Sequence, residues 1–315
     1  MKKKSLILLS ILVTLTVAIG YISKSFAEEK PKVAVVLKDL NSQYWEIVKA
    51  GAEKGFRDFG MDGQVLAPVE GTAEEQGEIL MGILQEDLDV LIVSPTYPDY
   101  IIPILDEFVA IGIPVLLLDT DHPWPNKTSY IGTDNIDLGK KAGALLASQL
   151  QPGDKVAMIG GDSNSPVSGG RITGARERLK DVGIYIAAEK LDLSNDSSSV
   201  KKATKEVLQG HSDIKGIIAS NDTLALHVIE VLQEHDLAIP VTGADGIIEM
   251  IELIEDEVVA GSVAQNPYDM GYLSVETALR TTNGEQVEKM IDSGVDIIIK
   301  GNAKQRLDFL KNLLR

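Results

Sequence analysis

The feature of this 315-residue sequence that most limits its fold is an alternation of short apolar runs with longer amphipathic stretches. Runs such as Val115-Leu116-Leu117-Leu118 are apolar at every position, which is typical of parallel strands covered on both faces. The stretches between them, such as residues 44–59 and 136–150, have helical spacing. Strands separated by helices indicate βαβ units, so the sequence predicts an α/β fold with parallel sheets. The expected strands cover residues 33–37, 90–93, 114–118, 156–159, 183–187, 216–219 and 258–263.

The alternation starts again after Asp134, where residues 155–245 repeat the rhythm of residues 32–119. No linker rich in Pro, Ser or Gly separates the two halves. We therefore expect two similar lobes that share several chain crossings. Residues 303–314 carry a stripe of leucines at helical spacing, which predicts a closing helix at the C-terminus.

The N-terminal segment indicates where the protein works. Lys2, Lys3 and Lys4 precede an apolar run over residues 6–22, and Ser25-Phe26-Ala27 places small residues before a cleavage point. Residues 1–27 therefore read as a secretory signal peptide. The run is also nearly long enough to span a bilayer, so a retained membrane anchor is the alternative. Either way we expect an exported protein, periplasmic or extracellular.

Composition and motifs exclude several classes of function. The formal net charge is −17, which opposes binding to nucleic acid or to an anionic membrane surface. The chain has no cysteine, and this removes disulfides, thiolate nucleophiles and cysteine-ligated metals. Its 4 histidines are scattered, and no HExxH, Walker A or nucleophile-elbow motif occurs. We expect no enzymatic activity, no metal and no cofactor.

Polar clusters directly follow the predicted strands. In open parallel sheets, ligands bind in the crevice beyond the carboxyl ends of the strands. Carboxylate, amide and guanidinium groups can each engage two neighbouring hydroxyls, and an aromatic ring can cover the apolar face of a sugar. The pattern predicts a site for a neutral, polyhydroxylated ligand. The clusters begin at Asp39, Ser94, Asp119, Asp162, Ser220, Gly243 and Ala264.

At these clusters the chain resembles the periplasmic sugar-binding proteins of the ribose-binding type, whose fold also occurs in the effector domains of lactose-repressor-like regulators. The resemblance runs over residues 32–300. It implies the type 1 periplasmic binding protein fold: two doubly wound parallel-sheet lobes joined by a multi-strand hinge. The lobes would be residues 32–133 with 266–294, and residues 134–265 with 295–315. The motifs that carry the resemblance are Leu40-Asn41-Ser42-Gln43-Tyr44-Trp45, Leu118-Asp119, Thr133-Asp134-Asn135, Arg171-Ile172-Thr173-Gly174, Ala219-Ser220-Asn221-Asp222, Gly243-Ala244-Asp245-Gly246 and Val263-Ala264-Gln265.

The resemblance also implies a set of ligand-binding residues. Tyr44 and Trp45 would sandwich the sugar ring from the first lobe, and Asp119 would bind its hydroxyls. Gln265 would reach the ligand from a hinge crossing. Three further positions depart from ribose binders, which puts ribose in doubt and leaves a pentose or a hexose open. The remaining expected ligand residues are Arg171, Asn221 and Asp245 in the second lobe, and Ser42, Ser94 and Thr120 at the departing positions.

The same resemblance implies a membrane partner. The expected function is delivery of a monosaccharide to an ABC transporter permease. The alternative is a sugar-sensing subunit that signals to a membrane histidine kinase, which is favoured by the lack of a lipidation cysteine and by the terminal helix. A DNA-binding regulator is excluded, because an export signal occupies the place where a helix-turn-helix would precede the first lobe.

Overall fold

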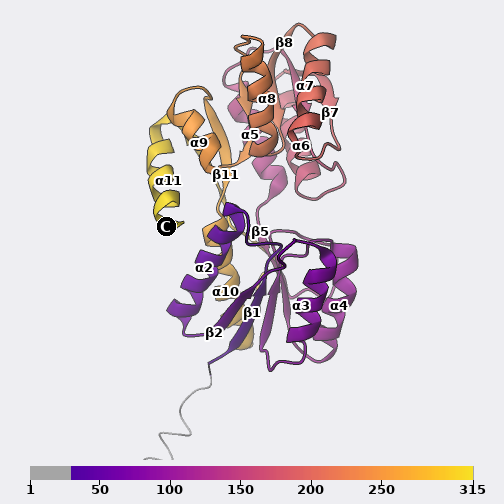
Figure 1. Cartoon of the computed structure of the whole chain (residues 1–315), viewed down its shortest axis with the longest axis vertical. Helices are drawn as coiled ribbons and strands as arrows, with labels where there is room; N and C mark the ends of the chain where they lie inside the picture. Colours follow the sequence, from indigo (N-terminus) through magenta and orange to yellow (C-terminus); the bar gives the residue numbers. More distant parts are fainter. Residues whose placement is uncertain (1–29, 315) are drawn as a thin grey trace, which may run out of the picture.

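The computed structural model describes residues 30–314. The expected signal segment, residues 1–27, lies outside the described residues. Figure 1 shows two α/β lobes stacked along the long axis of the molecule. Within residues 30–314, no helix is both long enough and apolar enough to cross a membrane.

The first lobe is built on a parallel sheet of 6 strands in the order β12-β5-β4-β3-β1-β2. Its strands are short and, in the centre, fully buried, as expected for a sheet covered by helices on both faces. These strands are β1 (Lys32–Val36), β2 (Asp62–Leu66), β3 (Val90–Val93), β4 (Val115–Leu118), β5 (Ser129–Gly132) and β12 (Met290–Asp292).

Alternate side chains of each strand feed two separate cores. Val33 and Val35 belong to the cluster beneath α2 and α10, whereas Ala34 and Val36 belong to the cluster beneath α3 and α4. This two-sided burial follows from the period of two along a strand. The four covering helices are α2 (Gln43–Phe59), α3 (Ala73–Ile83), α4 (Pro98–Ala110) and α10 (Pro267–Thr282).

The second lobe has a sheet in two sections, β7-β6-β8-β9 and β10-β11-β13. Only Gly243 separates β9 from β10, and β9 also contacts β11, so the two sections adjoin. All pairs are parallel except β11 with β13, which is antiparallel. The strands are β6 (Lys155–Ile159), β7 (Tyr185–Lys190), β8 (Ile214–Ala219), β9 (Val241–Thr242), β10 (Ala244–Asp245), β11 (Gly261–Gln265) and β13 (Val295–Ile299).

Helices cover both faces of this second sheet as well. On one face α5 and α6 enclose a core with Val156 and Met158, and on the other face α7, α8, α9 and α11 enclose a core with Ala157 and Ile159. The helices are α5 (Asn135–Ala147), α6 (Ser168–Asp181), α7 (Ser197–Gly210), α8 (Asp222–Glu234), α9 (Ile248–Glu255) and α11 (Lys300–Leu313).

The chain passes between the two sheets three times: from β5 to α5, from β11 to α10 and from β12 to β13. The last helix, α11, packs mainly against α9 and β13 of the second lobe. Its Phe309 also contacts Tyr268 at the start of α10, with ring centroids 5.9 Å apart. In Figure 1 this terminal helix accordingly lies beside the second lobe and ends near α2.

Each strand and helix expected from the sequence has a counterpart, with ends shifted by up to three residues. The elements that pattern reading missed carry weak signals. Strand β2 is half exposed and has Gly63 and Gln64 at its centre, and α4 begins at Pro98 and contains a second proline, Pro103. Proline normally interrupts a helical pattern, so sequence reasoning passed over α4. The other missed elements are β5, β9, β10, β12, β13, α9 and α10.

Candidate functional site

Two aspartates at the ends of strands share an uncommon backbone conformation. Asp119 directly follows β4 in the first lobe and has φ 61°, and Asp245 ends β10 in the second lobe with φ 121°. Positive φ is rare for residues other than glycine and costs free energy, so it persists only where the surroundings impose it. Such positions concentrate at functional sites, and both aspartates end strands of parallel sheets, at the edge where ligands bind.

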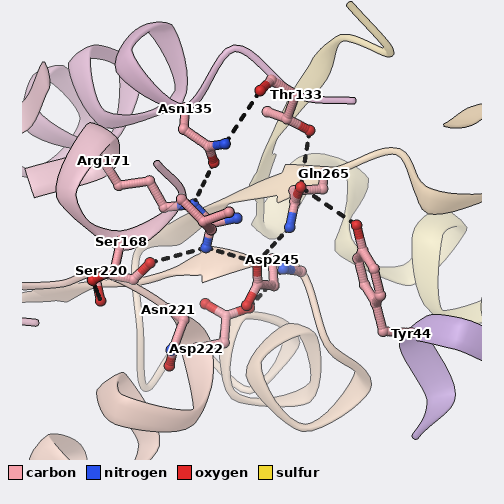
Figure 2. A network of polar contacts seen from close by, with 12 residues as sticks. Tyr44, Thr133, Asn135, Ser168, Arg171, Ser220, Asn221, Asp222, Asp245 and Gln265 are labelled. Carbon is pink, nitrogen blue, oxygen red and sulfur yellow. Dashed lines mark hydrogen bonds and ion pairs between the residues drawn. The ribbon is translucent and has the colours of Figure 1, made fainter. Parts of the chain in front are cut away.

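Arg171 forms the second-lobe side of a polar network. Its side chain, 4% exposed, pairs through Nη1 with Asp245 Oδ1 at 2.9 Å. Nη1 also donates to the Ser220 carbonyl at 3.0 Å, and Nε donates to Asn135 Oδ1 at 2.9 Å. Figure 2 shows the guanidinium held between these groups. Nη2 is buried and has no hydrogen-bond partner among the described residues, so one end of the guanidinium keeps an unused donor.

The placement of Arg171 depends on an unusually close helix crossing. A Cβ on Gly139 of α5 would lie 2.0 Å from the Arg171 carbonyl oxygen, and a Cβ on Gly174 of α6 would lie 2.0 Å from the Ile136 carbonyl oxygen. Any larger residue at either position would push the helices apart. The two glycines therefore allow α6 to bring Arg171 against Asn135 and Asp245.

Gln265, at the end of β11 where the chain crosses to α10, joins the two halves of the network. Its Nε2 donates to Asp245 Oδ1 at 2.8 Å. Its Oε1 accepts from the Thr133 hydroxyl at 2.9 Å and lies 3.5 Å from the Tyr44 hydroxyl oxygen, whose single proton points to Asp119 at 2.6 Å. Thr133 lies at another crossing, after β5, so one buried amide ties together two crossings and both lobes (Figure 2).

In the first lobe the network continues from Tyr44 to Asp119. The Tyr44 hydroxyl donates to Asp119 Oδ1 at 2.6 Å. The other carboxylate oxygen accepts from the Thr120 hydroxyl at 3.0 Å and lies 3.6 Å from Lys38 Nζ. Lys38 Nζ also donates to Thr120 Oγ1 at 2.6 Å. The site thus holds carboxylates, a guanidinium, an ammonium, an amide and a phenol.

Burial shifts the proton affinities of this network. Burial, reinforced by the negative charge of Asp119, raises the pKa of Tyr44 well above its usual value, so the phenol keeps its proton and remains a donor. Burial also raises the pKa of Asp245, although the Arg171 guanidinium opposes the shift. Among residues 30–314, no group of three or more His, Cys, Asp and Glu side chains is arranged to hold a metal ion.

The structure brings most of the predicted ligand residues together, but not all of them. Ser42 is exposed at the N-terminus of α2, and Ser94 is fully buried. Asn221 caps α8 by accepting from the Leu224 amide at 2.8 Å, and its Nδ2 lies 3.2 Å from Asn195 Oδ1. Within the part of the chain that the structure describes, these three side chains form no hydrogen bond or ion pair with the connected network of Tyr44, Asp119, Thr120, Arg171, Asp245 and Gln265.

The predicted sandwich of a sugar ring between Tyr44 and Trp45 is wrong for this arrangement. The two rings contact each other edge to face, with centroids 5.0 Å apart and planes at 90°. No ring can enter between them. Trp45 is 6% exposed and belongs to the core beneath α2, because consecutive helix positions point in directions about 100° apart. Tyr44 donates a hydrogen bond within the polar network, whereas Trp45 contributes only a ring face beneath Lys38, whose Nζ lies 5.7 Å from the ring centroid.

Sequence reasoning missed four residues that the structure adds to the network. Lys38 lies two residues after the end of β1, so the strand-end rule that selected Asp119 would also have found it. Thr133 and Asn135 flank the first crossing, and Asp222 follows β8 within a cluster that the sequence had marked. Their roles depend on partners that are distant in sequence, and no local pattern shows these partners.

The sequence and the fold of this chain are similar to those of known proteins. The sequence profile of a periplasmic binding protein domain matches residues 33–286. The ribose import binding protein RbsB of Bacillus subtilis is 27% identical over 277 residues, which cover 86% of this chain and 88% of that protein. A periplasmic ribose ABC transporter structure from Conexibacter woesei has a TM-score of 0.84 at 22% identity, covering 90% of this chain and 96% of that one.

A solute binding protein from Agrobacterium radiobacter, solved in complex with D-arabinose, is 25% identical with a TM-score of 0.75, covering 90% of this chain and 99% of that one. The predicted fold class and the predicted resemblance to ribose-type binding proteins are both confirmed. The chain belongs to the periplasmic binding protein domain family.

Proposed function

We propose that this protein binds a monosaccharide between its two lobes and delivers it to an ABC transporter. The observation that carries this proposal is the pair of aspartates, Asp119 and Asp245, held at strand ends of opposite lobes and linked through Tyr44 and Gln265. Each carboxylate can accept from two adjacent hydroxyls, which is the spacing that a sugar offers.

The other groups of the network suit a neutral ligand. Arg171 has an unused donor that a sugar oxygen would satisfy, and a buried donor without an acceptor is costly. The positive charges of Lys38 and Arg171 balance the two aspartates, so a ligand needs no net charge of its own. The exposed Ser42 and the partly exposed Asn221 would join the contacts when the lobes close.

The three crossings, near Asp134, Gln265 and Val295, would serve as the hinge. The lobes would then be residues 32–133 with 266–294, and residues 134–265 with 295–315. Closure brings groups of both lobes onto one ligand, and contacts made only in the closed state favour closure. Thr133 and Gln265 lie at two of these crossings and are hydrogen-bonded to each other, so a rotation of the lobes would change this contact.

The names of the relatives favour transport over sensing, because they describe ribose import and ABC transporter components. The related protein from Agrobacterium radiobacter was solved in complex with D-arabinose, and this supports a monosaccharide as the ligand class of the present protein. In this proposal the protein binds sugar outside the cytoplasm and presents it to a permease. It has no enzymatic activity of its own.

A thermal-shift screen of the purified protein against pentoses, hexoses and polyols tests the proposal. A ligand that binds only the folded state adds about 2.7 kcal/mol of stability at a hundredfold excess over its dissociation constant. This raises the melting temperature by several degrees. A shift with one monosaccharide, reproduced by titration calorimetry, would support sugar binding, and the absence of a shift with every sugar would contradict it.

A further inference from the structure

Asp222, in the first turn of α8, is a fully buried carboxylate outside the set of ligand residues argued above. Its side chain is 0% exposed. Burying a carboxylate is unfavourable unless hydrogen bonds compensate for the lost water. The cap of α8 is already provided by Asn221, which accepts from the Leu224 amide. The buried carboxyl group therefore needs an explanation other than helix capping.

The contacts of Asp222 point to the loop that carries Asp245. Its Oδ2 accepts from the backbone amides of Gly246 at 2.6 Å and Ile247 at 3.1 Å, the two amides that follow Asp245. Its Oδ1 accepts from the Ser262 hydroxyl of β11 at 2.8 Å. Figure 2 shows Asp222 directly beside Asp245. One carboxylate thus fastens the end of β10 to α8 and β11.

The fastened segment has a backbone that would not form by itself. Asp245 and Gly246 are consecutive residues with φ 121° and 72°. Successive amides in such a turn converge on a concavity that an oxygen acceptor can fill, and here the acceptor is Asp222 Oδ2. The turn also lies tightly on β11, since a Cβ on Gly246 would be 2.4 Å from the Ala264 Cβ.

We propose that Asp222 is a positioning residue for sugar binding, which holds the Asp245 carboxylate where Arg171 and Gln265 meet it. The inference rests on the proposed role of Asp245. Asp222 itself is too buried to touch a sugar. Its removal leaves two amides without an acceptor and frees Asp245 to leave its positive-φ conformation, so the carboxylate no longer faces its partners.

The test compares Asp222→Ala, Asp222→Asn and a matched control, Val228→Ala. Val228 is fully buried in the same helix and its side chain has no hydrogen-bonding group, so this substitution should destabilise the lobe without removing a hydrogen bond of the turn. Affinities for D-ribose, D-arabinose and D-allose are measured by titration calorimetry well below the melting temperature. Because Asp222→Ala removes the acceptor of the Gly246 and Ile247 amides, it should weaken sugar binding by roughly tenfold or more.

Asp222→Asn should stay near the wild-type affinity, because its amide oxygen can still accept from both amides while its nitrogen faces Ser262. Val228→Ala should lower the melting temperature and leave affinity unchanged. If Asp222→Ala does not fold, Asp222→Ser replaces it, since a serine hydroxyl is too short to reach both amides. Wild-type affinity in whichever of these two variants folds overturns the proposal.

Amide hydrogen exchange of the ligand-free protein gives a readout that is independent of sugar. Gly246 and Ile247 should lose protection in Asp222→Ala and keep it in Asp222→Asn and Val228→Ala. Unchanged protection in Asp222→Ala would overturn the positioning role. If the wild type binds none of the three sugars, the proposed sugar-binding function fails for them, and the exchange measurement still decides whether Asp222 holds the turn.

Discussion

The two lobes solve the same structural problem by different means. Each presents an aspartate in a positive-φ conformation at the end of a strand. In the first lobe the backbone around Asp119 is fixed by a hydrogen bond from the Tyr130 hydroxyl to the Asp119 carbonyl at 2.9 Å. In the second lobe a buried carboxylate, Asp222, binds the two amides beyond Asp245.

The side chains of the two aspartates also differ in their partners. Asp119 is held by Tyr44, Thr120 and the partly exposed Lys38. Asp245 is held by a buried guanidinium and by Gln265. The first lobe therefore relies on neutral donors and one partly exposed charge, whereas the second relies on the buried Arg171 guanidinium. Buried ionic groups lose more when one partner is removed, so the second lobe should be the more sensitive of the two.

The largest expected effect is the loss of Asp245. Asp245→Ala leaves Arg171 and Gln265 without their shared acceptor and should weaken sugar binding by about 3 kcal/mol, roughly a hundredfold. Asp119→Ala should cost less, because its partners are neutral or partly solvated. Titration calorimetry measures both, with Asp256→Ala, at the exposed end of α9, as a control for charge. Equal losses for the two site aspartates would break the comparison.

The second lobe should also make the free energy of unfolding depend on pH. Burial, with the nearby charge of Asp245, raises the pKa of Asp222 from 3.8 to about 7. The folded state therefore holds this proton more tightly than the unfolded state. Its contribution to stability is fully present below pH 3.8 and is lost as pH rises toward 7.

Asp222→Asn removes this titration, so the difference in unfolding free energy between wild type and variant isolates it. Urea unfolding at pH 5, 6, 7 and 8 is the measurement. The wild type should lose stability relative to the variant as pH rises. A constant difference across that range would show that Asp222 does not titrate there.

A smaller effect is expected at the counterpart in the first lobe. Tyr130 is 3% exposed, and Tyr130→Phe removes only the hydroxyl that binds the Asp119 carbonyl. One lost buried hydrogen bond should lower the free energy of unfolding by about 1 kcal/mol. Chemical denaturation with an unchanged m-value would support this. A loss as large as that of Asp222→Ala would mean that both lobes depend equally on their anchors.

The smallest effect should follow loss of the solvated cation. Lys38 is 27% exposed and lies 3.6 Å from Asp119, so Lys38→Met should weaken sugar binding by about 0.5 kcal/mol, roughly two- to threefold. The effect should shrink further in high salt, because an exposed ion pair is screened. A salt-independent loss of tenfold or more would instead make Lys38 a direct contact of the ligand.

The sequence by itself determined the α/β class and the expected position of the site. Fully apolar runs such as residues 115–118 specify buried parallel strands, because only a sheet covered on both faces buries every side chain. Polar residues that follow strands must then gather at one sheet edge. Asp119, Asp245 and Gln265 lie in these strand-end clusters, which are a local property of the chain, whereas Arg171, inside α6, was expected only from the resemblance.

Only the tertiary structure decided which of those residues work together. Trp45 and Tyr44 are adjacent in sequence, yet one lies in the core and the other in the network, because a helix turns neighbouring side chains apart. The role of Asp222 could not be predicted either, because its hydrogen-bond partners lie 24, 25 and 40 residues away along the chain. Periodicity reports which side of an element is buried, whereas the pairing of buried polar groups depends on how distant elements pack.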